Sequence, residues 1–535
     1  MPSSSSPTRN SLIVVITLLL SGVALHAKDV NVKDFGAAAD GKTLDSDAIQ
    51  KAIDAAAGDG GGKVTIPKGA YLAGTIVLKD NITLHLEDGA EIRGTTDLTQ
   101  YKNLDPFKDG LGAEVGTAFV TIIDAKNVTI EGKGTFNGNG KAVAAAKSFK
   151  GEGWGFRPML FRVVRGKNIA VRDVTFRDSA SWTTNYFQCD GVKIDNVKID
   201  SHVAPHNDGI NIDACQNFSI TNCDVYSGDD ALVLKSTTDI PCRNITATNL
   251  KLRSNQGAIK LGTESLGGFE NIRVSKCEIR ETRNGGIKIL CVDGGELKDV
   301  IVEDILMDNV RTPIFVRLGA RLKTFRAGDA KKPVGSLKNV VIRNVKANAA
   351  ADAQIMPPSG IFITGIPGHA IEDLALENIE IHLAGGGTSE QARAEVQENI
   401  DAYPEINRFG KTLPAFGVFL RHARGVKLDD ITLKLDAPDH RPALFVQDVS
   451  DLKLTGWKIP ASAPNATLLH FSDVQDASIS RCELDGTGAD VFLHVEGNAS
   501  AKINVSDALP AGATIKVVDF GSNANPTSVL TKEPR

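Results

Sequence analysis

The chain has few aromatic residues, almost no excess of charge of one sign, and few long apolar runs. Phe, Trp and Tyr make up only 5% of its 535 residues. Lys and Arg total 60 and Asp and Glu total 65, so the formal net charge is −5 and no overall positive field would attract nucleic acid. The content of 42% hydrophobic and 23% charged residues is typical of a soluble globular protein and excludes a mostly disordered chain.

The one long apolar run lies near the N-terminus. Residues 12–20 are apolar apart from Thr17, they follow Arg9, and mostly small residues lead up to Ala27. This pattern predicts an export signal over residues 1–27, and the run is shorter than the roughly 20 residues that span a bilayer. We therefore expect a secreted or periplasmic protein whose mature chain, residues 28–535, forms one domain with no membrane span and no nucleic-acid partner.

The chain is built from a repeat. Units that begin with Asn, Asp or Gly and continue as an alternating apolar and polar stretch start at residues 168, 191, 217, 244, 271 and 299, with steps of 23, 26, 27, 27 and 28. Later units start at residues 339, 425, 451 and 476, and the longer gaps predict inserted loops over residues 321–333 and 385–413. The alternation predicts a β-strand in each unit, and one such strand cannot bury its apolar side alone.

A strand repeat with this period predicts an all-β, right-handed parallel β-helix, in which each unit forms one coil of a solenoid. Leucine-rich repeats share the period, but their leucine spacing is missing. The 51 glycines, about 9.5% against a usual value of roughly 7%, fit coil corners that need a positive φ. The few aromatic residues fit a narrow interior filled by Val, Ile and Ala.

Two segments have the pattern of a helix. Residues 45–57 place five apolar side chains on one side, and such a helix would cover the open N-terminal end of the solenoid. These five residues are Ala48, Ile49, Ala52, Ile53 and Ala56. Residues 388–399 are also expected to be helical and to lie outside the stack of coils.

The seven cysteines follow the repeat rather than a zinc-binding spacing. Cys223, Cys277 and Cys482 occupy the sixth position after a unit start, where other units have Val, Leu or Ile, so we expect them to fill the core. Three other cysteines lie two residues before a unit start, so they would stack on consecutive coils. They are Cys189, Cys215 and Cys242. One pair of these three could form a disulfide.

Three aspartates gather in the middle coils. Asn207-Asp208-Gly209 is followed one coil later by Gly228-Asp229-Asp230, and aligning Ile210 with Leu232 puts Asp208 and Asp230 at the same position of neighbouring coils. Carboxylates this close raise the pKa values of one another, and proteins keep such clusters mainly at metal and acid/base sites. Two carboxyl groups beside a glycosidic bond can hydrolyse it with no metal and no cofactor. We therefore expect Asp208, Asp229 and Asp230 to be catalytic.

The same alignment places basic residues beside the aspartates. Lys260 and Lys288 fall in the outward column of Asn211, and Lys235 and Arg317 fall in the next outward column. Such a strip would attract an acidic sugar polymer even though the whole protein is slightly acidic. The alternative is that these are ordinary solvated side chains on the surface of a sheet.

The chain also resembles a known family through motifs that cover most of the mature sequence. The motifs include Asp34-Phe-Gly36, Val64-Thr-Ile-Pro67, Ser181-Trp182-Thr183, Asn207-Asp208-Gly209, Gly228-Asp229-Asp230, Tyr403-Pro404-Glu405 and Arg421-His422. In these it is similar to glycoside hydrolase family 28, the polygalacturonases and rhamnogalacturonan hydrolases, which are right-handed parallel β-helices. The resemblance implies hydrolysis with inversion, with Asp229 as the general acid and with Asp208 and Asp230 holding the attacking water.

Two motifs depart from the polygalacturonases of that family. Their Gly-His-Gly turn is replaced by Gln256-Gly257-Ala258, and their Arg-Ile-Lys strand by Gly286-Ile-Lys288. Because the missing residues grip a galacturonate in the family, the departures favour another pectic linkage, such as that of rhamnogalacturonan. Lys260 and Glu264 are the expected local replacements.

We thus expect an exported glycoside hydrolase that cleaves an acidic, pectin-related polysaccharide. The residues expected to bind the substrate are Asn207, Lys260, Glu264, Lys288, Lys235, Arg317, Trp182 and His206. Trp182 could instead pack at a coil edge, and His206 could be a solvated turn residue. Two other functions stay open: a calcium-dependent polysaccharide lyase, and a carbohydrate-binding β-helix without catalysis.

Overall fold

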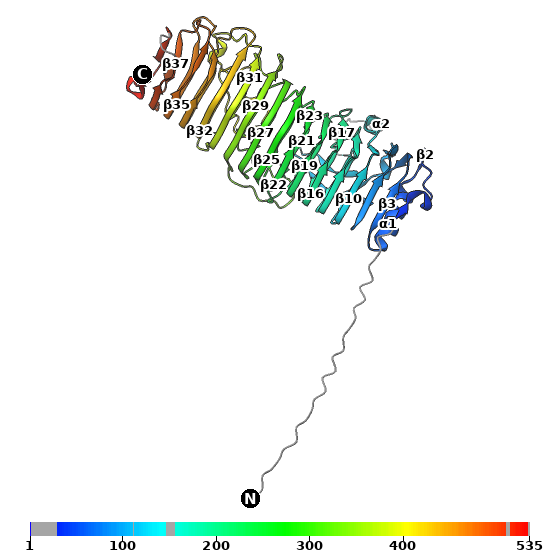
Figure 1. The fold of residues 1–535 in the computed structure, drawn as a ribbon. Coiled ribbons are helices and arrows are strands. Elements are labelled where there is room, and N and C mark those ends of the chain that lie inside the picture. The colour runs from blue at the N-terminus through cyan, green and yellow to red at the C-terminus, as the bar shows by residue number, and fades with distance from the viewer. Residues whose placement is uncertain (2–28, 111, 146–155, 510–513, 533–535) are drawn as a thin grey trace.

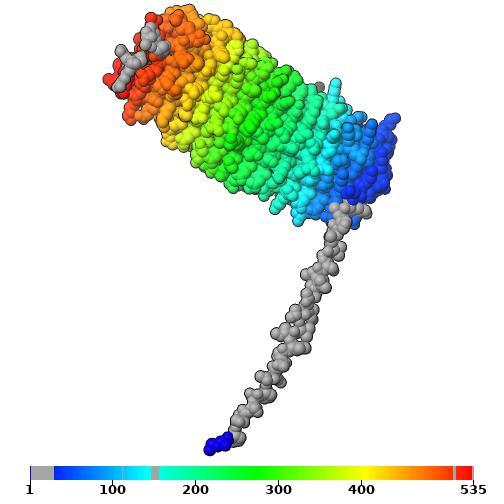
Figure 2. Space-filling model, viewed as in Figure 1, coloured from blue at the N-terminus to red at the C-terminus, as the bar shows by residue number. Residues whose placement is uncertain are grey.

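Strands of successive repeats pair in parallel and in register. In the computed structural model, which describes residues 1, 29–110, 112–145, 156–509 and 514–532, 40 strands form one continuous sheet. Strands β13 (Lys167–Arg172), β16 (Asp190–Asp195), β19 (Gln216–Thr221) and β22 (Cys242–Thr248) are stacked so that Ile169, Val192, Phe218 and Ile245 lie in one column. The result is the right-handed parallel β-helix that the repeat predicts. Figures 1 and 2 show it as a long body that runs from its N-terminal to its C-terminal coils. The predicted export signal lies, apart from Met1, outside the described residues.

One sheet of the solenoid, here called the front sheet, carries the candidate site. Its strands follow one another along the axis, each paired in parallel with the next. They include β15 (Thr184–Phe187), β18 (Ile210–Asp213), β21 (Leu232–Ser236), β24 (Ile259–Ser265), β26 (Ile287–Cys291), β28 (Ile314–Leu318), β30 (Ile361–Thr364), β32 (Val418–Leu435), β33 (Leu444–Thr455), β35 (Thr467–Ser480) and β37 (Val491–Glu496). An antiparallel hairpin, β8 (Lys102–Lys108) with β9 (Glu114–Ile123), departs from this pattern.

Asparagines, rather than glycines, form the corners where several of the repeat units start. Asn217, Asn244 and Asn271 have φ values of 52°, 56° and 54°. The Nδ2 atom of Asn244 donates to Oδ1 of Asn217 at 3.0 Å, and Nδ2 of Asn271 donates to Oδ1 of Asn244 at 2.8 Å. Asparagine tolerates a left-handed backbone, and its amide continues the stack from coil to coil, which glycine cannot do. The expectation that glycine serves these corners holds where a unit starts with Gly191 or Gly425, whose φ values are 74° and 68°.

The N-terminal end of the stack is covered by helix α1 (Ser46–Gly58), which confirms the predicted capping helix (Figure 1). Its five predicted apolar residues are all buried. The carboxylate of Asp45, just before the helix, accepts hydrogen bonds from the backbone N–H groups of Ala38 (2.7 Å) and Ala39 (3.1 Å). A second helix, α2 (Gly140–Ala145), is short.

The prediction of a helix over residues 388–399 is wrong, because only Gln391–Arg393 form a 3₁₀ turn there. Two buried arginines of the coils use carbonyl groups of this segment. Arg421 donates to the carbonyl oxygens of Val396 (2.8 Å) and Gln397 (3.1 Å), and Arg317 donates to those of Glu398 (3.0 Å) and Asn399 (3.1 Å). The 3₁₀ turn ends at Ala394, whose backbone is extended with φ −62° and ψ 131°. The four hydrogen bonds from the arginines then hold residues 396–399 against the coils. The segment does lie outside the stack, as expected.

All seven cysteines are free and buried. Cys189 and Cys215 lie on neighbouring coils, and the N–H of Cys189 donates to Sγ of Cys215 at 3.3 Å. Cys189, Cys215 and Cys242 are therefore three separate thiols, and no pair of them forms the disulfide that the sequence left open.

No helix of the described segments is long and apolar enough to cross a membrane.

Candidate active site

One outward-facing column of the front sheet, here called the front column, changes from polar to aromatic along the axis. Successive parallel pairs stack its members from β15 to β37 in strict order. They are Asn185, Asn211, Val233, Lys260, Lys288, Phe315, Phe362, Phe419, Phe445, His470 and His494. The register confirms the sequence alignment that placed Lys260 and Lys288 beside Asn211.

Three carboxyl groups meet where two front strands begin. Ile210 pairs with Leu232, so Asp208 and Asp230 lie side by side on neighbouring coils, with Asp229 next to them. One oxygen of each carboxyl group lies within 4.8 Å of an oxygen of each of the others. The close approach depends on Gly209, because a β-carbon there would lie 2.5 Å from the carbonyl oxygen of Ala231. The structure therefore brings together the three residues that the sequence predicted to be catalytic.

Each carboxyl group has different partners. Asp230 accepts hydrogen bonds from Nζ of Lys260 (2.7 Å) and from the N–H of Gly257 (3.0 Å). Asp208 accepts one from Nδ2 of Asn211 at 2.9 Å, and its Oδ2 lies 3.2 Å from Nζ of Lys235. Asp229 instead accepts a hydrogen bond from the N–H of Asp230 at 3.0 Å, and its Oδ2 lies 3.9 Å from Nδ1 of His206.

These partners separate the three pKa values. Burial, and next the negative charges of Asp208 and Asp230, raise the pKa of Asp229 well above its ordinary value. Burial also raises the pKa of Asp208, to about 6, against the opposing effect of Lys235. At Asp230 burial acts in the same direction but is outweighed by the charges of Lys260 and Lys288, so its pKa is lowered. The cluster can therefore hold a proton on Asp229 next to an ionised Asp230, which is the arrangement that acid/base catalysis needs.

The three lysines of the predicted basic strip are neither solvated nor available to a ligand as free charges. Lys235, Lys260 and Lys288 are buried, with 8%, 6% and 1% of their surface exposed. Their ammonium groups pair with carboxylates of this chain: Lys235 with Asp208 (3.2 Å) and Glu264 (3.9 Å), Lys260 with Asp230 (2.7 Å), and Lys288 with Glu405 (3.2 Å). The alternative of ordinary solvated side chains is thus wrong, because each of these lysines is buried and lies in an ion pair of this chain.

Three further predicted contact residues surround the aspartates. His206 has a half-buried side chain, and burial, together with the charges of Arg157 and Lys235, lowers its pKa to about 4. Trp182 is 4% exposed, and the Nζ atom of Lys235 lies 4.1 Å from its ring centroid. The indole therefore makes a cation–π contact with the ammonium group of Lys235. Asn207 is fully buried. Its Nδ2 donates to the carbonyl oxygen of Ser179 (2.7 Å) and to Oγ of Ser201 (2.9 Å), which suits a residue that holds the turn of Asp208.

Arg317 lies in the predicted column but serves another purpose. Its guanidinium donates to Oγ1 of Thr364 (3.2 Å) and to the carbonyl oxygens of Gly365 (2.8 Å), Glu398 (3.0 Å) and Asn399 (3.1 Å). The side chain is 1% exposed. This arginine anchors the inserted segment 384–417 on the front sheet.

Glu405 is a member of the site that reasoning from the sequence did not assign. Both of its carboxylate oxygens lie 3.2 Å from Nζ of Lys288, and it also accepts a hydrogen bond from Asn284. Asn284 in turn donates to Oε1 of Gln256 at 3.0 Å. Asn284 and Glu405 therefore lie beside Gln256, which begins the turn that replaces the Gly-His-Gly turn of the polygalacturonases. The Tyr403-Pro404-Glu405 motif was the available signal, but Glu405 lies 117 residues from Lys288 in the chain.

Glu264 lies under the hairpin of β8 and β9. A β-carbon at Gly110 would lie only 1.7 Å from Oε1 of Glu264, so the hairpin tip passes directly over that carboxylate. Nζ of Lys323, in the irregular segment 319–335, donates to the carbonyl oxygen of Gly110 at 3.2 Å. Glu264 therefore faces Lys235 inside a covered part of the site.

The three aspartates could in principle hold a cation, since their oxygens lie close enough together. Two ammonium groups, however, already supply positive charge at this place: Lys260 at 2.7 Å from Asp230 and Lys235 at 3.2 Å from Asp208. Since these lysines would repel a metal ion, the donor set fits a proton-transfer site better than a calcium site.

Comparison with known proteins agrees with this geometry. The probable polygalacturonase of Vitis vinifera is 26% identical over 394 residues, which cover 69% of this chain and 78% of that protein. An exopolygalacturonase from Thermotoga maritima has a similar fold, with a TM-score of 0.60 and 20% identity over 76% of this chain and 92% of that one. The family 28 exopolygalacturonase of Yersinia enterocolitica gives a TM-score of 0.60 and 18% identity, over 84% of this chain and 78% of that one.

A sequence model of a whole protein family also matches the part of the chain that contains the site. The family model of glycosyl hydrolases family 28 matches residues 60–400, which include all three aspartates. Because this match spans more than half of the 535 residues, the chain belongs to glycosyl hydrolases family 28 and is a glycoside hydrolase.

Proposed function

We propose that the chain hydrolyses a glycosidic bond in a pectic polysaccharide, a galacturonan or rhamnogalacturonan, by acid/base catalysis, with the inversion that the resemblance to glycoside hydrolase family 28 implies. The observation that carries this proposal is the cluster of Asp208, Asp229 and Asp230, in which Lys260 pairs with Asp230 at 2.7 Å. Its charge lowers the pKa of Asp230, whereas burial raises the pKa of Asp229. The polymer class follows from the relatives, which are named polygalacturonases. The pairing of every site lysine with a carboxylate favours a cleavage subsite that is not built to neutralise several uronates, as in rhamnogalacturonan.

In the proposed mechanism Asp229 donates its proton to the glycosidic oxygen as the bond from that oxygen to the anomeric carbon breaks. Asp208 and Asp230 hold a water molecule on the opposite side of the sugar. Asp230 takes one proton of this water as its oxygen bonds to the anomeric carbon, so that one water is consumed for each bond cleaved. Lys260 keeps Asp230 ionised for this step.

The inserted segment 384–417 supports action at a chain end. Its residues Ile406, Phe409 and Leu413 pack on the front column at Phe315 and Phe362, with ring centroids of Phe409 and Phe362 5.0 Å apart. This packing fills the outer face of the coils that follow Lys288, where an internal stretch of polymer would otherwise continue. We therefore infer exo action.

A carboxyl-to-amide variant of the proposed acid tests the function. Asp229→Asn keeps the size of the side chain but cannot supply the proton. We therefore expect turnover to fall by roughly 10²-fold to 10⁴-fold, the range of general acid catalysis. Reducing ends released from polygalacturonate and from rhamnogalacturonan would be measured, with circular dichroism to check the fold. Asp224→Asn, on the exposed side of β20 (Asp224–Ser227), is the matched control.

The products separate the competing functions. Full activity of Asp229→Asn would contradict the acid assignment, and unsaturated ends that absorb in the near ultraviolet would indicate a lyase. Proton NMR of the first product would show inversion as the opposite anomer from the substrate. Mass analysis at early times would show short products for exo action and a spread of lengths for endo action.

A further inference from the structure

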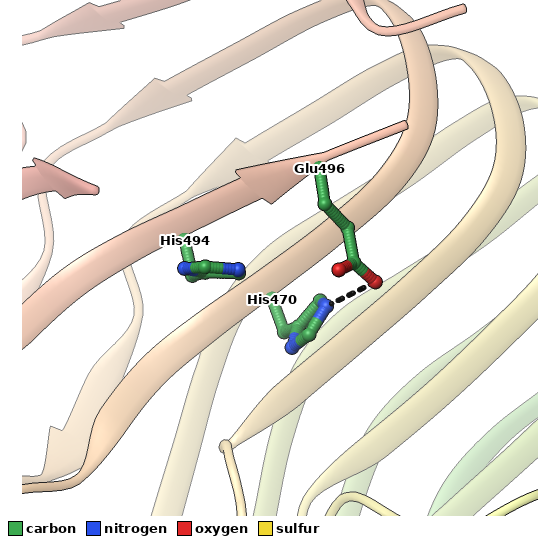
Figure 3. A group of neighbouring side chains, drawn as sticks. All are labelled: His470, His494 and Glu496. Atoms are coloured by element: carbon green, nitrogen blue, oxygen red, sulfur yellow. Dashed lines mark hydrogen bonds and ion pairs between the residues drawn. The ribbon is translucent and has the colours of Figure 1, made fainter. Parts of the chain in front are cut away.

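The front column ends in two histidines outside the candidate active site. His470 of β35 and His494 of β37 are direct partners in the parallel ladder, so both imidazoles project from the same side of the sheet. Glu496 follows His494 by two residues on the same strand and therefore points to the same side. The register of the coils, and not a mobile loop, places these three side chains together (Figure 3).

The three side chains converge on one point. Nε2 of His470 lies 3.0 Å from Oε1 of Glu496, and the centroids of the two imidazole rings are 5.0 Å apart. One ligand atom from each of His470, His494 and Glu496 lies within 4.8 Å of the others. Tetrahedral zinc binds nitrogen and oxygen at about 2.0–2.2 Å, which places its ligand atoms roughly 3.3 Å apart. Binding of the ion would therefore bring these atoms from within 4.8 Å of one another to about 3.3 Å.

Neighbouring groups orient both imidazoles. Nδ1 of His494 lies 2.9 Å from Oδ2 of Asp519, on β39 (Lys516–Phe520). A carboxylate in this position favours the tautomer with the proton on Nδ1, which leaves the lone pair of Nε2 available to a metal. The ring of His470 stacks on Phe445 with centroids 4.5 Å apart, which restricts its rotation.

Space and access are also present. The side chains of His470, His494 and Glu496 are 20%, 21% and 35% exposed, so an ion and a water ligand can reach them. A β-carbon at Gly521 would lie 2.5 Å from Nε2 of His494. Any other residue at position 521 would therefore cover the nitrogen that faces away from Asp519.

The alternative is a pair of surface ion pairs between histidines and carboxylates. The chain has such a pair elsewhere: Nε2 of His382 lies 2.8 Å from Oδ1 of Asp436 on the exposed surface. That pair has one imidazole, whereas the group on β35 and β37 combines two imidazoles, a shared carboxylate and a second carboxylate behind His494. Two histidines and one carboxylate form a donor set that suits zinc-class cations.

We propose that His470, His494 and Glu496 bind a divalent transition-metal ion of the zinc class, with water as the remaining ligand. His470 lies six coil steps from Lys260 along the front column, about 29 Å at roughly 4.8 Å per strand. The ion therefore takes no part in the proposed hydrolysis. It joins two successive coils near the C-terminal end of the solenoid and stabilises them.

Calorimetric titration of the full-length, untagged protein with Zn²⁺ tests the site. We expect one saturable high-affinity ion per chain and a higher melting temperature when it is bound. His494→Gln and Glu496→Gln should each lose this binding, and Asp519→Asn should weaken it by about 10-fold to 100-fold. Ca²⁺ and Mg²⁺, which prefer oxygen ligands, should not compete. His382→Gln is the matched control and should bind Zn²⁺ as the unaltered protein does.

Three results would overturn the proposal. The first is Zn²⁺ binding of unchanged affinity in both His494→Gln and Glu496→Gln, which would place the ion elsewhere, for example at the catalytic aspartates. The second is the absence of saturable binding in the unaltered protein. The third is an equal loss of binding in His382→Gln. Circular dichroism of each variant shows whether the coils are intact, and Asp519→Asn tests the site without removing a ligand.

Discussion

At the scale of single residues, burial acts on three adjacent carboxyl groups with different results. It raises the pKa of Asp229 and of Asp208, but at Asp230 the positive charges of Lys260 and Lys288 outweigh it. The pKa values of two residues that are neighbours in the sequence are thus shifted in opposite directions. The cause is the lysine of the next coil, 30 residues further along the chain.

This difference predicts the pH dependence of activity. The base Asp230 must be ionised, so kcat/KM should fall as the pH decreases through its lowered pKa, and the acid Asp229 must be protonated, so kcat/KM should fall as the pH rises through its raised pKa. Lys260→Met removes the charge that lowers the pKa of Asp230, so the acidic limb should move to higher pH. The profile of kcat/KM against pH measures this shift.

The control for that experiment is Lys193→Met, which changes an exposed lysine of β16, a strand that pairs with β13 and β19 and lies outside the front sheet; it should leave the profile unchanged. Because the three carboxyl groups interact, the two limbs report pKa values of the cluster as a whole. An acidic limb that stays in place in Lys260→Met would contradict the role given to this lysine.

At the scale of elements, the corners of the coils depend on asparagines with positive φ. Asn244 has a φ of 56°, donates to Asn217 and accepts from Asn271. Asn244→Ala should lower the free energy of unfolding through the lost amide contacts and through a left-handed backbone cost of about 1–2 kcal/mol. Asn244→Gly loses the same contacts but not the backbone cost, so it should be the less destabilised variant. Urea unfolding curves measure both, and equal losses would contradict the backbone contribution.

The inserted segment 384–417 is held by arginines of the coils. Arg317→Met removes its hydrogen bonds to the carbonyl groups of Glu398 and Asn399. We expect faster limited proteolysis within residues 384–417 and, because Glu405 lies in this segment, a lower kcat/KM. Arg424→Met, whose side chain is 61% exposed, is the control. Unchanged cleavage in Arg317→Met, with an intact far-ultraviolet spectrum, would show that other contacts hold the segment.

At the scale of the whole molecule, the solenoid is stabilised by stacking and not by cross-links. Core residues of each coil lie on those of the next, from α1 to the last strands, and seven buried thiols are part of this arrangement. We expect no reaction of the native protein with a thiol reagent and seven modified cysteines after unfolding without reductant. Mass spectrometry counts them, and five modified cysteines instead of seven would reveal a disulfide.

The sequence by itself determined the coil, its register and the meeting of the three aspartates. The physical reason is that a strand repeat of nearly constant length can bury its apolar side only by stacking, and stacking places equivalent positions side by side. The alignment of Ile210 with Leu232 and of Lys260 with Lys288 therefore needed no further information.

The tertiary structure alone decided what surrounds the aspartates. Glu405 reaches Lys288 from an insertion that the repeat does not describe, and the hairpin at Gly110 covers Glu264 from an earlier part of the chain. The helix expected over residues 388–399 does not form, and hydrogen bonds from Arg317 and Arg421 hold the end of this segment against the coils instead. Insertions follow no period, so only the folded chain shows which charges they neutralise. That is why a strip of lysines that looked free in the sequence is fully paired in the structure.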